Sequence, residues 1–217
     1  MEDLHDLCPW CRLRVEPCPA AHWSGTGLPV SGETQPDRAG PGDGGIQVHS
    51  AVLYSGLPGE MIVRLKFSGE KYLAAAAARL ILRYSRLLPS SGDVIVPVPV
   101  SRKRKRERGY NQAALIAGRL ASATGAAMRK LLARKHGPSQ LEMSVAGRRK
   151  NVEGVFHPGG GRRVPGGRRI WLVDDVATTF STMHSAAGAL LENGADRVTG
   201  LTLAYRRRGT GSIIRNE

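Results

Sequence analysis

Two adjacent carboxylates followed by a run of hydroxyl side chains are the residues of this chain best suited to chemistry. Asp174 and Asp175 come directly after the apolar run IWLV, and the hydroxyl groups follow at Thr178, Thr179, Ser181 and Thr182. In an open α/β sheet, ligands bind beyond the carboxyl ends of the strands. The first N–H groups of the helix that follows lack partners within it and attract anions. Two carboxylates can accept hydrogen bonds from vicinal hydroxyls, and the turn can hold a phosphate. Together they match the two ends of a ribose 5-phosphate.

This segment resembles the phosphoribosyl pyrophosphate (PRPP) motif of type I phosphoribosyltransferases, which reads Asp-Asp-(Val/Ile)-x-Thr-Thr-Gly-x-Thr. The resemblance implies that Asp174 and Asp175 hold the ribose hydroxyls and are the catalytic residues. It also implies that the 5′-phosphate is wrapped by a second set, Ala177, Thr178, Thr179, Phe180, Ser181 and Thr182. The same residues could instead form an ordinary strand-to-helix turn after an acidic pair.

Phe180 is the one departure from the motif, since it stands where the motif has glycine. Glycine tolerates positive φ and lets the backbone approach a ligand closely. A left-handed conformation costs any other residue roughly 1–2 kcal/mol. Phe180 could therefore reshape the turn, weaken the site, or mark a protein that binds its ligand without turning it over.

A dense basic run follows the apolar stretch VIVPVPV. Its six cations are Arg102, Lys103, Arg104, Lys105, Arg106 and Arg108. Cations beyond a strand end could stabilise a departing diphosphate, and Arg102, Lys103, Arg104 and Arg108 are the candidates for that contact. They could equally hold a nucleic-acid backbone, or form a solvated charge run.

Three cysteines near the N-terminus suggest a metal site. Cys8 and Cys11 form a CxxC pair, and Cys18 and His22 follow at short spacing. Four such ligands suit tetrahedral zinc, which would be structural in so short a segment. His5 is another possible fourth ligand. The alternative is a segment with free thiols and no metal.

Composition and charge narrow the class of protein. The 217-residue chain carries 32 Lys and Arg against 18 Asp and Glu, a formal net charge of +14, which favours anionic partners such as phosphates or nucleic acid. No apolar run reaches the ~18 residues of a membrane span, and the acidic N-terminus lacks the apolar core of a signal peptide. We therefore expect a cytoplasmic protein without membrane insertion.

The elements that must position these residues alternate between strand and helix. The pattern predicts strands at 49–54, 94–98, 128–134, 170–173 and 198–204, and helices at 58–67, 70–88, 111–123 and 182–193. Short apolar strands separated by helices predict an α/β fold with a doubly wound, mainly parallel sheet. The chain divides into a candidate zinc-ribbon-like module (1–23), a Gly- and Pro-rich linker (24–47), the α/β domain (48–207) and a tail (208–217).

Together these segments resemble the ComF family, whose members are linked to competence and DNA uptake. The features that carry the resemblance are Lys66-Phe67, the VPVP string, the string Arg108-Gly109-Tyr110-Asn111-Gln112, Gln140, Arg149, Asn151-Val152, Phe156 and the acidic motif. The resemblance implies a type I phosphoribosyltransferase fold that binds PRPP with Mg²⁺. The long basic loop across residues 133–156 looks like the mobile lid of such enzymes, which excludes water from the reaction centre.

Two functions follow from these observations. In the first, the protein is an enzyme that transfers the phosphoribosyl group from Mg–PRPP to an acceptor and releases pyrophosphate. In the second, the fold binds PRPP or a nucleotide without catalysis, and its basic surface engages single-stranded DNA. A nucleotide-sensing regulator on the same fold is a third possibility. Scarce aromatic residues, 5% of the chain, count against a surface that binds single strands by stacking.

Overall fold

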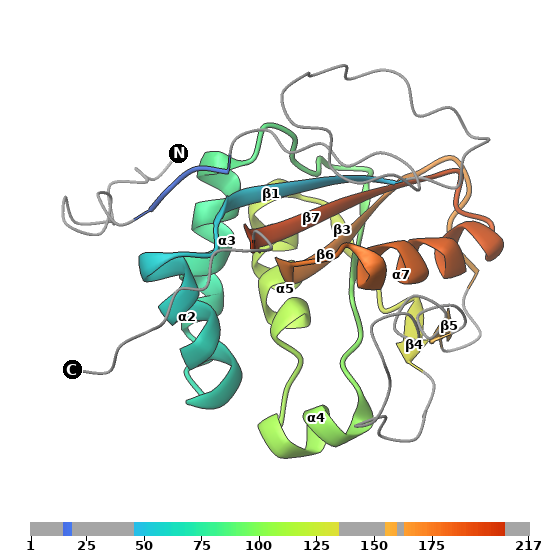
Figure 1. The fold of residues 1–217 in the computed structure, drawn as a ribbon. Coiled ribbons are helices and arrows are strands. Elements are labelled where there is room, and N and C mark those ends of the chain that lie inside the picture. The colour runs from blue at the N-terminus through green and yellow to red at the C-terminus, as the bar shows by residue number, and fades with distance from the viewer. Residues whose placement is uncertain (1–14, 19–45, 135–154, 160–162, 207–217) are drawn as a thin grey trace.

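The structure, a computed structural model, describes residues 15–18, 46–134, 155–159 and 163–206. Strands and helices alternate along most of this part of the chain (Figure 1). The strands are β1 (Gln47–Leu53), β2 (Val94–Pro97), β3 (Ala127–Met128), β4 (Leu132–Arg134), β5 (Phe156–Pro158), β6 (Arg169–Ala177) and β7 (Arg197–Tyr205). The helices are α2 (Gly56–Phe67), α3 (Leu73–Tyr84), α4 (Arg102–Arg108), α5 (Gln112–Thr124) and α7 (Ser181–Glu192).

The main sheet has five strands in the order β1-β7-β6-β2-β3, and every neighbouring pair is parallel. This confirms the predicted α/β fold with a parallel sheet. From β2 the chain passes outward to β3, whereas from β6 it passes the other way to β7. The direction of winding therefore changes between β2 and β6, which is the position where open α/β sheets bind their ligands.

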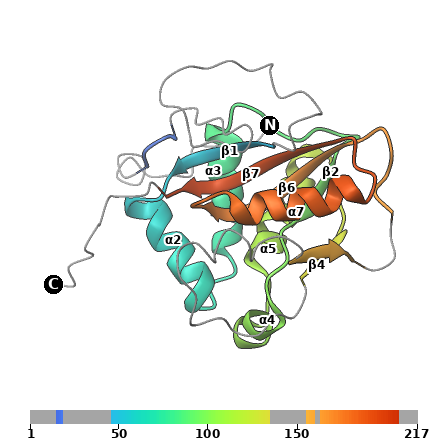
Figure 2. The same cartoon turned by 45° about the vertical axis from the view of Figure 1, so that its right-hand side comes forward.

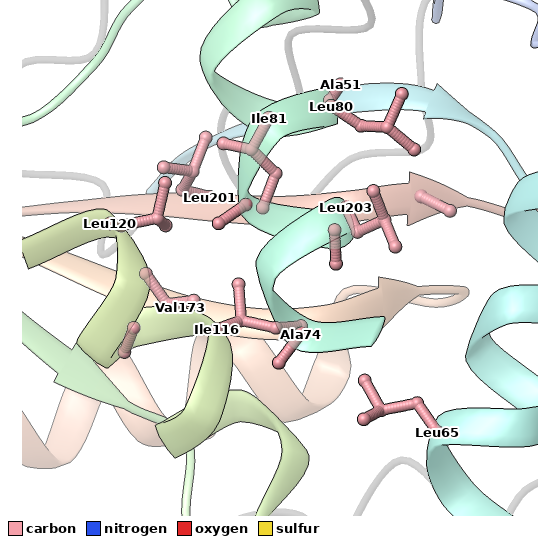
Figure 3. Packing of buried hydrophobic residues seen from close by; sticks show 14 of the residues in the cluster. Ala51, Leu65, Ala74, Leu80, Ile81, Ile116, Leu120, Val173, Leu201 and Leu203 are labelled. Atoms are coloured by element: carbon pink, nitrogen blue, oxygen red, sulfur yellow. The ribbon is translucent and has the colours of Figure 1, made fainter. Parts of the chain in front are cut away.

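Two hydrophobic clusters cover the two faces of the sheet. On one face, helices α2, α3 and α5 pack against strand residues that include Trp171, Val173 and Leu201 (Figure 3). On the other face, α7 packs with β4 and β5 against Ile170 and Leu172. Because the apolar strands are buried on both faces, they read as continuous apolar runs in the sequence.

Gly200 allows α7 to lie close to the sheet. A Cβ atom at this position in β7 would lie 2.9 Å from both Met183 Cε of α7 and Val48 Cγ2 of β1. At such a distance Met183 or Val48 would have to shift to make room for a side chain. The first turns of α7 are thereby held against β7, beside the end of β6 (Figure 2).

The predicted strand at 128–134 is wrong in its extent. Its first residue belongs to β3 at the edge of the main sheet, whereas β4 lies in a separate two-stranded sheet, antiparallel to β5. The basic pair Arg129-Lys130 separates these strands and is exposed. The predicted lid at 133–156 lies mostly outside the described residues.

The basic run forms a short helix, α4, that the sequence patterns did not predict. The Ser101 hydroxyl accepts a hydrogen bond from the Arg104 N–H at 3.2 Å, and Gly109 ends the helix with a left-handed φ of 77°. None of the residues of α4 is buried. In Figures 1 and 2 the helix lies away from the sheet, at the bottom of the molecule.

A short piece of the N-terminal region lies along the edge strand β1. Pro17 forms an antiparallel bridge with Val52, and Val15 is buried in the core. The Cys18 N–H donates to the Ala51 carbonyl at 3.0 Å. Residues 15–18 thus cover part of the edge of the sheet. The rest of the predicted zinc module and residues 24–45 of the predicted linker lie outside the described residues.

Candidate functional site

The acidic motif lies at the carboxyl end of β6, beside the point where the winding changes. The strand continues through Asp174 and Asp175 to Ala177, so it is longer than the predicted 170–173. Val98 follows the neighbouring strand β2, and its N–H donates to the Val173 carbonyl at 2.9 Å. The ends of the two strands that flank the change of winding are therefore held together.

Phe180 adopts the backbone conformation that its motif reserves for glycine. Its φ is 57° and its ψ is −8°, in the left-handed region, at the residue that precedes α7. Among the described residues it is the only one other than glycine with a positive φ. Phe180 therefore occupies a region of backbone conformation that favours glycine.

Side-chain burial offsets the backbone strain at Phe180. The residue is 6% exposed, and its ring stacks on Tyr205 of β7 with centroids 5.4 Å apart and planes 16° apart. A buried aromatic side chain contributes about 1.5–3 kcal/mol relative to an exposed one. That is enough to balance the roughly 1–2 kcal/mol cost of the left-handed conformation.

The hydroxyl residues of the motif surround the start of α7. Thr178, Thr179 and Thr182 are exposed and Ser181 is half-buried, and the Thr179 and Ser181 hydroxyls lie 2.5 Å apart. Phe180, at the N-cap position, makes no side-chain capping hydrogen bond to this helix. The helix is twelve residues long, so its N-terminus carries the partial positive charge that favours an anion.

The two carboxylates have different surroundings. Asp174 is half-buried, and its Oδ1 accepts a hydrogen bond from the Asp175 N–H at 2.8 Å. Asp175 is 2% exposed, and its Oδ2 lies 2.7 Å from Nζ of Lys66 in the last turn of α2. Burial raises the pKa of Asp174 well above its usual range; the Asp175 carboxylate raises it further, and Lys66 partly opposes them.

Arg134, at the end of β4, is a site residue that the sequence patterns missed. Its guanidinium lies over the Phe156 ring, 5.4 Å from the centroid. Burial lowers the pKa of Arg134, the charge of Arg104 on α4 lowers it further, and Asp174 raises it. Arg134 is therefore within electrostatic range of both the basic helix and the acidic pair. Its weak strand pattern gave no indication of this position.

The Arg-Gly-Tyr-Asn-Gln string connects α4 to the core. The Tyr110 hydroxyl donates to the Leu65 carbonyl at 2.5 Å, and the Asn111 side chain donates to the Val98 carbonyl at 2.9 Å. Asn111 also caps α5, since its Oδ1 accepts from the Ala114 N–H. The string thus joins α2, the end of β2 and α5, which are the elements around the motif.

Arg108, the last residue of α4, reaches an exposed aromatic ring. Its guanidinium lies 5.1 Å from the centroid of Phe67, which is 73% exposed, and it donates to Oε1 of Gln112 at 3.2 Å. Of the four predicted anion contacts, Arg102, Lys103 and Arg104 are exposed and Arg108 is half-buried. The structure brings Arg104 into electrostatic range of Arg134.

Most of the predicted zinc ligands lie outside the described residues. Cys8, Cys11, His22 and the alternative His5 are among these, and Cys18 is half-buried. Within the described ranges, no three His, Cys, Asp or Glu residues lie together as a metal site. The zinc site stays a prediction. The same part of the chain contains no helix long and apolar enough to cross a membrane.

Comparison with curated proteins identifies the family. The chain is 31% identical over 162 residues to competence protein ComFC of Bacillus subtilis, a match that covers 72% of this chain and 63% of that protein. It is 35% identical over 147 residues to DNA utilization protein YhgH of Salmonella typhi, and 30% identical over 148 residues to competence protein F of Haemophilus influenzae. Each of these two matches covers 64% of this chain and 63% of the relative. The chain belongs to the ComF family.

Comparisons with family models and with solved structures give less information about the chain. No family model matches the chain. Among solved structures it is similar to glutamine PRPP amidotransferase from B. subtilis, at 24% identity and a TM-score of 0.39, over 63% of this chain and 26% of that one. It is also similar to adenine phosphoribosyltransferase from Leishmania tarentolae, at 15% identity and a TM-score of 0.37, over 66% and 73% of the two chains. Such low TM-scores support no conclusion about function.

Proposed function

We propose that the turn between β6 and α7 binds the ribose 5-phosphate part of PRPP, as in type I phosphoribosyltransferases. One observation carries the proposal: Phe180, at the glycine position of the motif, keeps a glycine-like φ of 57°. A fold retains about 1–2 kcal/mol of strain only where the surrounding structure enforces it. Because strained residues of this kind cluster at ligand sites, the conformation of Phe180 supports a binding role for the turn.

Each part of the ligand has a matching group in this proposal. The 5-phosphate lies at the start of α7, where the backbone N–H groups and the hydroxyls of Thr178, Thr179, Ser181 and Thr182 can donate to it. The ribose hydroxyls donate to the acidic pair. The diphosphate, which brings its Mg²⁺, faces the basic residues of α4, with Arg134 on the Asp174 side.

The reaction that follows is a displacement at C1 of the ribose. The acceptor forms a bond to C1, the bond from C1 to the diphosphate oxygen breaks, and the electron pair of that bond leaves with pyrophosphate. The cations of α4 and Arg134 stabilise the charge that develops on the leaving group. The protein's contribution is positioning and charge stabilisation, and the acceptor's proton passes to solvent or to the departing pyrophosphate.

A second candidate function is binding of single-stranded DNA without catalysis. It is favoured by the exposed cations of α4 beside the exposed ring of Phe67, because nucleic-acid strands bind to basic surfaces with aromatic side chains on which bases stack. The relatives' names, competence and DNA utilization proteins, make DNA uptake the proposed setting for either function. The chain spans only 63% of the length of those relatives.

Calorimetric titration of Mg–PRPP tests the first function. We expect binding in the micromolar range by the wild type, and none by the Asp174→Asn/Asp175→Asn double variant. Thr179→Val is a milder variant at an exposed position, and we expect it to weaken binding without loss of the fold. An absence of binding to folded wild-type protein would contradict the proposal. Release of pyrophosphate with a panel of bases would then separate an enzyme from a binding protein.

Fluorescence anisotropy with a labelled single-stranded oligonucleotide tests the second function. DNA binding through α4 should weaken steeply with salt, because each neutralised phosphate releases counterions. Replacing Arg102 and Arg106 with glutamine should reduce the slope, whereas Phe67→Ala should weaken binding at all salt concentrations. Salt-independent binding, or binding indifferent to both changes, would contradict this function.

A further inference from the structure

A buried ion pair between α2 and β6 gives the two carboxylates of the acidic motif different surroundings. Lys66 and Asp175 approach to 2.7 Å, and their side chains are only 18% and 3% exposed. The contact is an ion pair between an ammonium and a carboxylate. A second ion pair joins Arg64 of α2 to Glu70, which follows the helix, and its arginine side chain is far more exposed, at 53%.

Strand geometry gives the two carboxylates different neighbours. Successive side chains of a strand point to opposite faces of the sheet. Trp171 and Val173 lie in the cluster under α2, α3 and α5, so Asp175 shares their face, where Lys66 meets it. Asp174 shares the face of Ile170 and Leu172, under α7. That is also the face from which Arg134 interacts with it.

We propose that Asp174 alone supplies the carboxylate that contacts the sugar, and that Lys66 is a positioning residue that acts on the site through Asp175. This inference rests on the phosphoribosyl site proposed above and refines it, since the motif alone assigns both aspartates to the ribose. A carboxylate that is almost fully buried and paired with an ammonium is poorly placed to accept a further hydrogen bond from a ligand.

Lys66 affects ligand binding because it offsets the negative charge beside Asp174. Without the ammonium, Asp175 would be a buried, unpaired carboxylate next to the carboxylate of Asp174. Keeping both of them ionised would cost considerable free energy. One of them would take up a proton or turn away. Either change would disturb Asp174, although Lys66 itself does not touch the ligand.

The test measures Mg–PRPP affinity and thermal unfolding for a set of variants on the same protein. Asp174→Asn should weaken binding by roughly 10- to 100-fold, as expected for the loss of a charged hydrogen-bond acceptor. Lys66→Met should weaken it by about tenfold, and Lys66→Arg should restore it because arginine can pair with Asp175. The double variant Lys66→Met/Asp175→Asn carries no unpaired charge and should bind better than Lys66→Met alone.

Arg64→Met removes the other cation of α2 that pairs with a carboxylate, so it serves as the matched control, with unchanged affinity expected. If the double variant loses binding as completely as Asp174→Asn while it stays folded, Asp175 contacts the ligand and the inference is wrong. It is equally wrong if Lys66→Met binds as the wild type does. If wild-type protein does not bind Mg–PRPP at all, the proposed function is contradicted. Thermal unfolding of the Lys66 and Asp175 variants then still measures whether the two residues are coupled as an ion pair, independently of any ligand.

Discussion

The turn between β6 and α7 and the helix α4 are both candidate anion sites, but they are built in opposite ways. The turn is anchored in the core: Asp175, at the end of β6, and Phe180 are 2% and 6% exposed, and Phe180 holds a strained backbone. Helix α4 has no buried residue and lies away from the sheet (Figure 1). Residues of the turn are therefore fixed by packing, whereas those of α4 supply charge with little geometric constraint.

This difference separates shape recognition from electrostatic attraction. A site that must hold two ends of one small ligand needs fixed groups, which the turn provides. Cations on an exposed helix can attract any polyanion, whether a diphosphate or a DNA strand. We therefore expect specificity to depend on the turn, and the strength and salt dependence of binding to depend on α4.

The largest expected effect on stability comes from Phe180, because it lies in the core of the turn. Phe180→Ala should lower the free energy of unfolding by about 3–4 kcal/mol, since it removes a buried ring but keeps the left-handed strain. Phe180→Gly should lower it by about 1 kcal/mol less, because glycine relieves that strain. Chemical denaturation measures both.

The informative result is which of the two Phe180 variants has the higher free energy of unfolding. If glycine proved no better than alanine, the left-handed conformation would not be strained, and the reason for assigning a glycine-type turn would disappear. The glycine variant should also keep its affinity for Mg–PRPP, since it restores the motif.

A smaller effect is expected when charge is removed from α4. Replacing Arg102, Lys103 and Arg106 with glutamine should change the free energy of unfolding by less than about 0.5 kcal/mol, because exposed side chains contribute little to stability. Affinity for Mg–PRPP should fall about tenfold at low salt, and the difference should shrink as salt screens the helix. A large loss of stability would show that α4 is as closely packed as the turn.

The smallest expected effect is a gain of stability from Asp174→Asn. The folded-state pKa of Asp174 is raised by burial and by Asp175, so ionisation of this residue disfavours the folded state. Wild-type stability should therefore improve as pH falls through that raised pKa towards the ordinary range of an aspartate. Asparagine removes this dependence and should stabilise the fold at neutral pH. Thermal unfolding of both proteins across pH measures the difference, and a less stable asparagine variant would contradict it.

The sequence predicted the turn better than its surroundings. The apolar run before Asp174 and the hydroxyl residues after it predict a strand and a helix start. The helix begins one residue earlier than predicted, and the strand ends four residues later. Helix α4 was not predicted because its run of cations shows no apolar periodicity. Ser101 and Gly109, which flank it, are nevertheless typical N-cap and C-cap residues.

Long-range contacts could not be predicted from local patterns. Nothing in the residues around Lys66 indicates that its ammonium meets Asp175, because the contact depends on how α2 packs on the sheet. The predicted strand at 128–134 failed for a similar reason. Exposed Arg129 and Lys130 divide it, and β4 pairs with β5, which comes more than twenty residues later in the chain.

The most direct test of the central claim is an NMR titration of nitrogen-15-labelled protein with ribose 5-phosphate. This ligand carries the sugar and the 5-phosphate but no diphosphate. The account predicts that amide shifts change first at Ala177, Phe180, Ser181 and Thr182, at the turn and the start of α7, and that they saturate. Changes confined to Arg102–Arg108, without saturation, would show that the protein attracts anions only through α4, and would contradict a phosphoribosyl site at the turn.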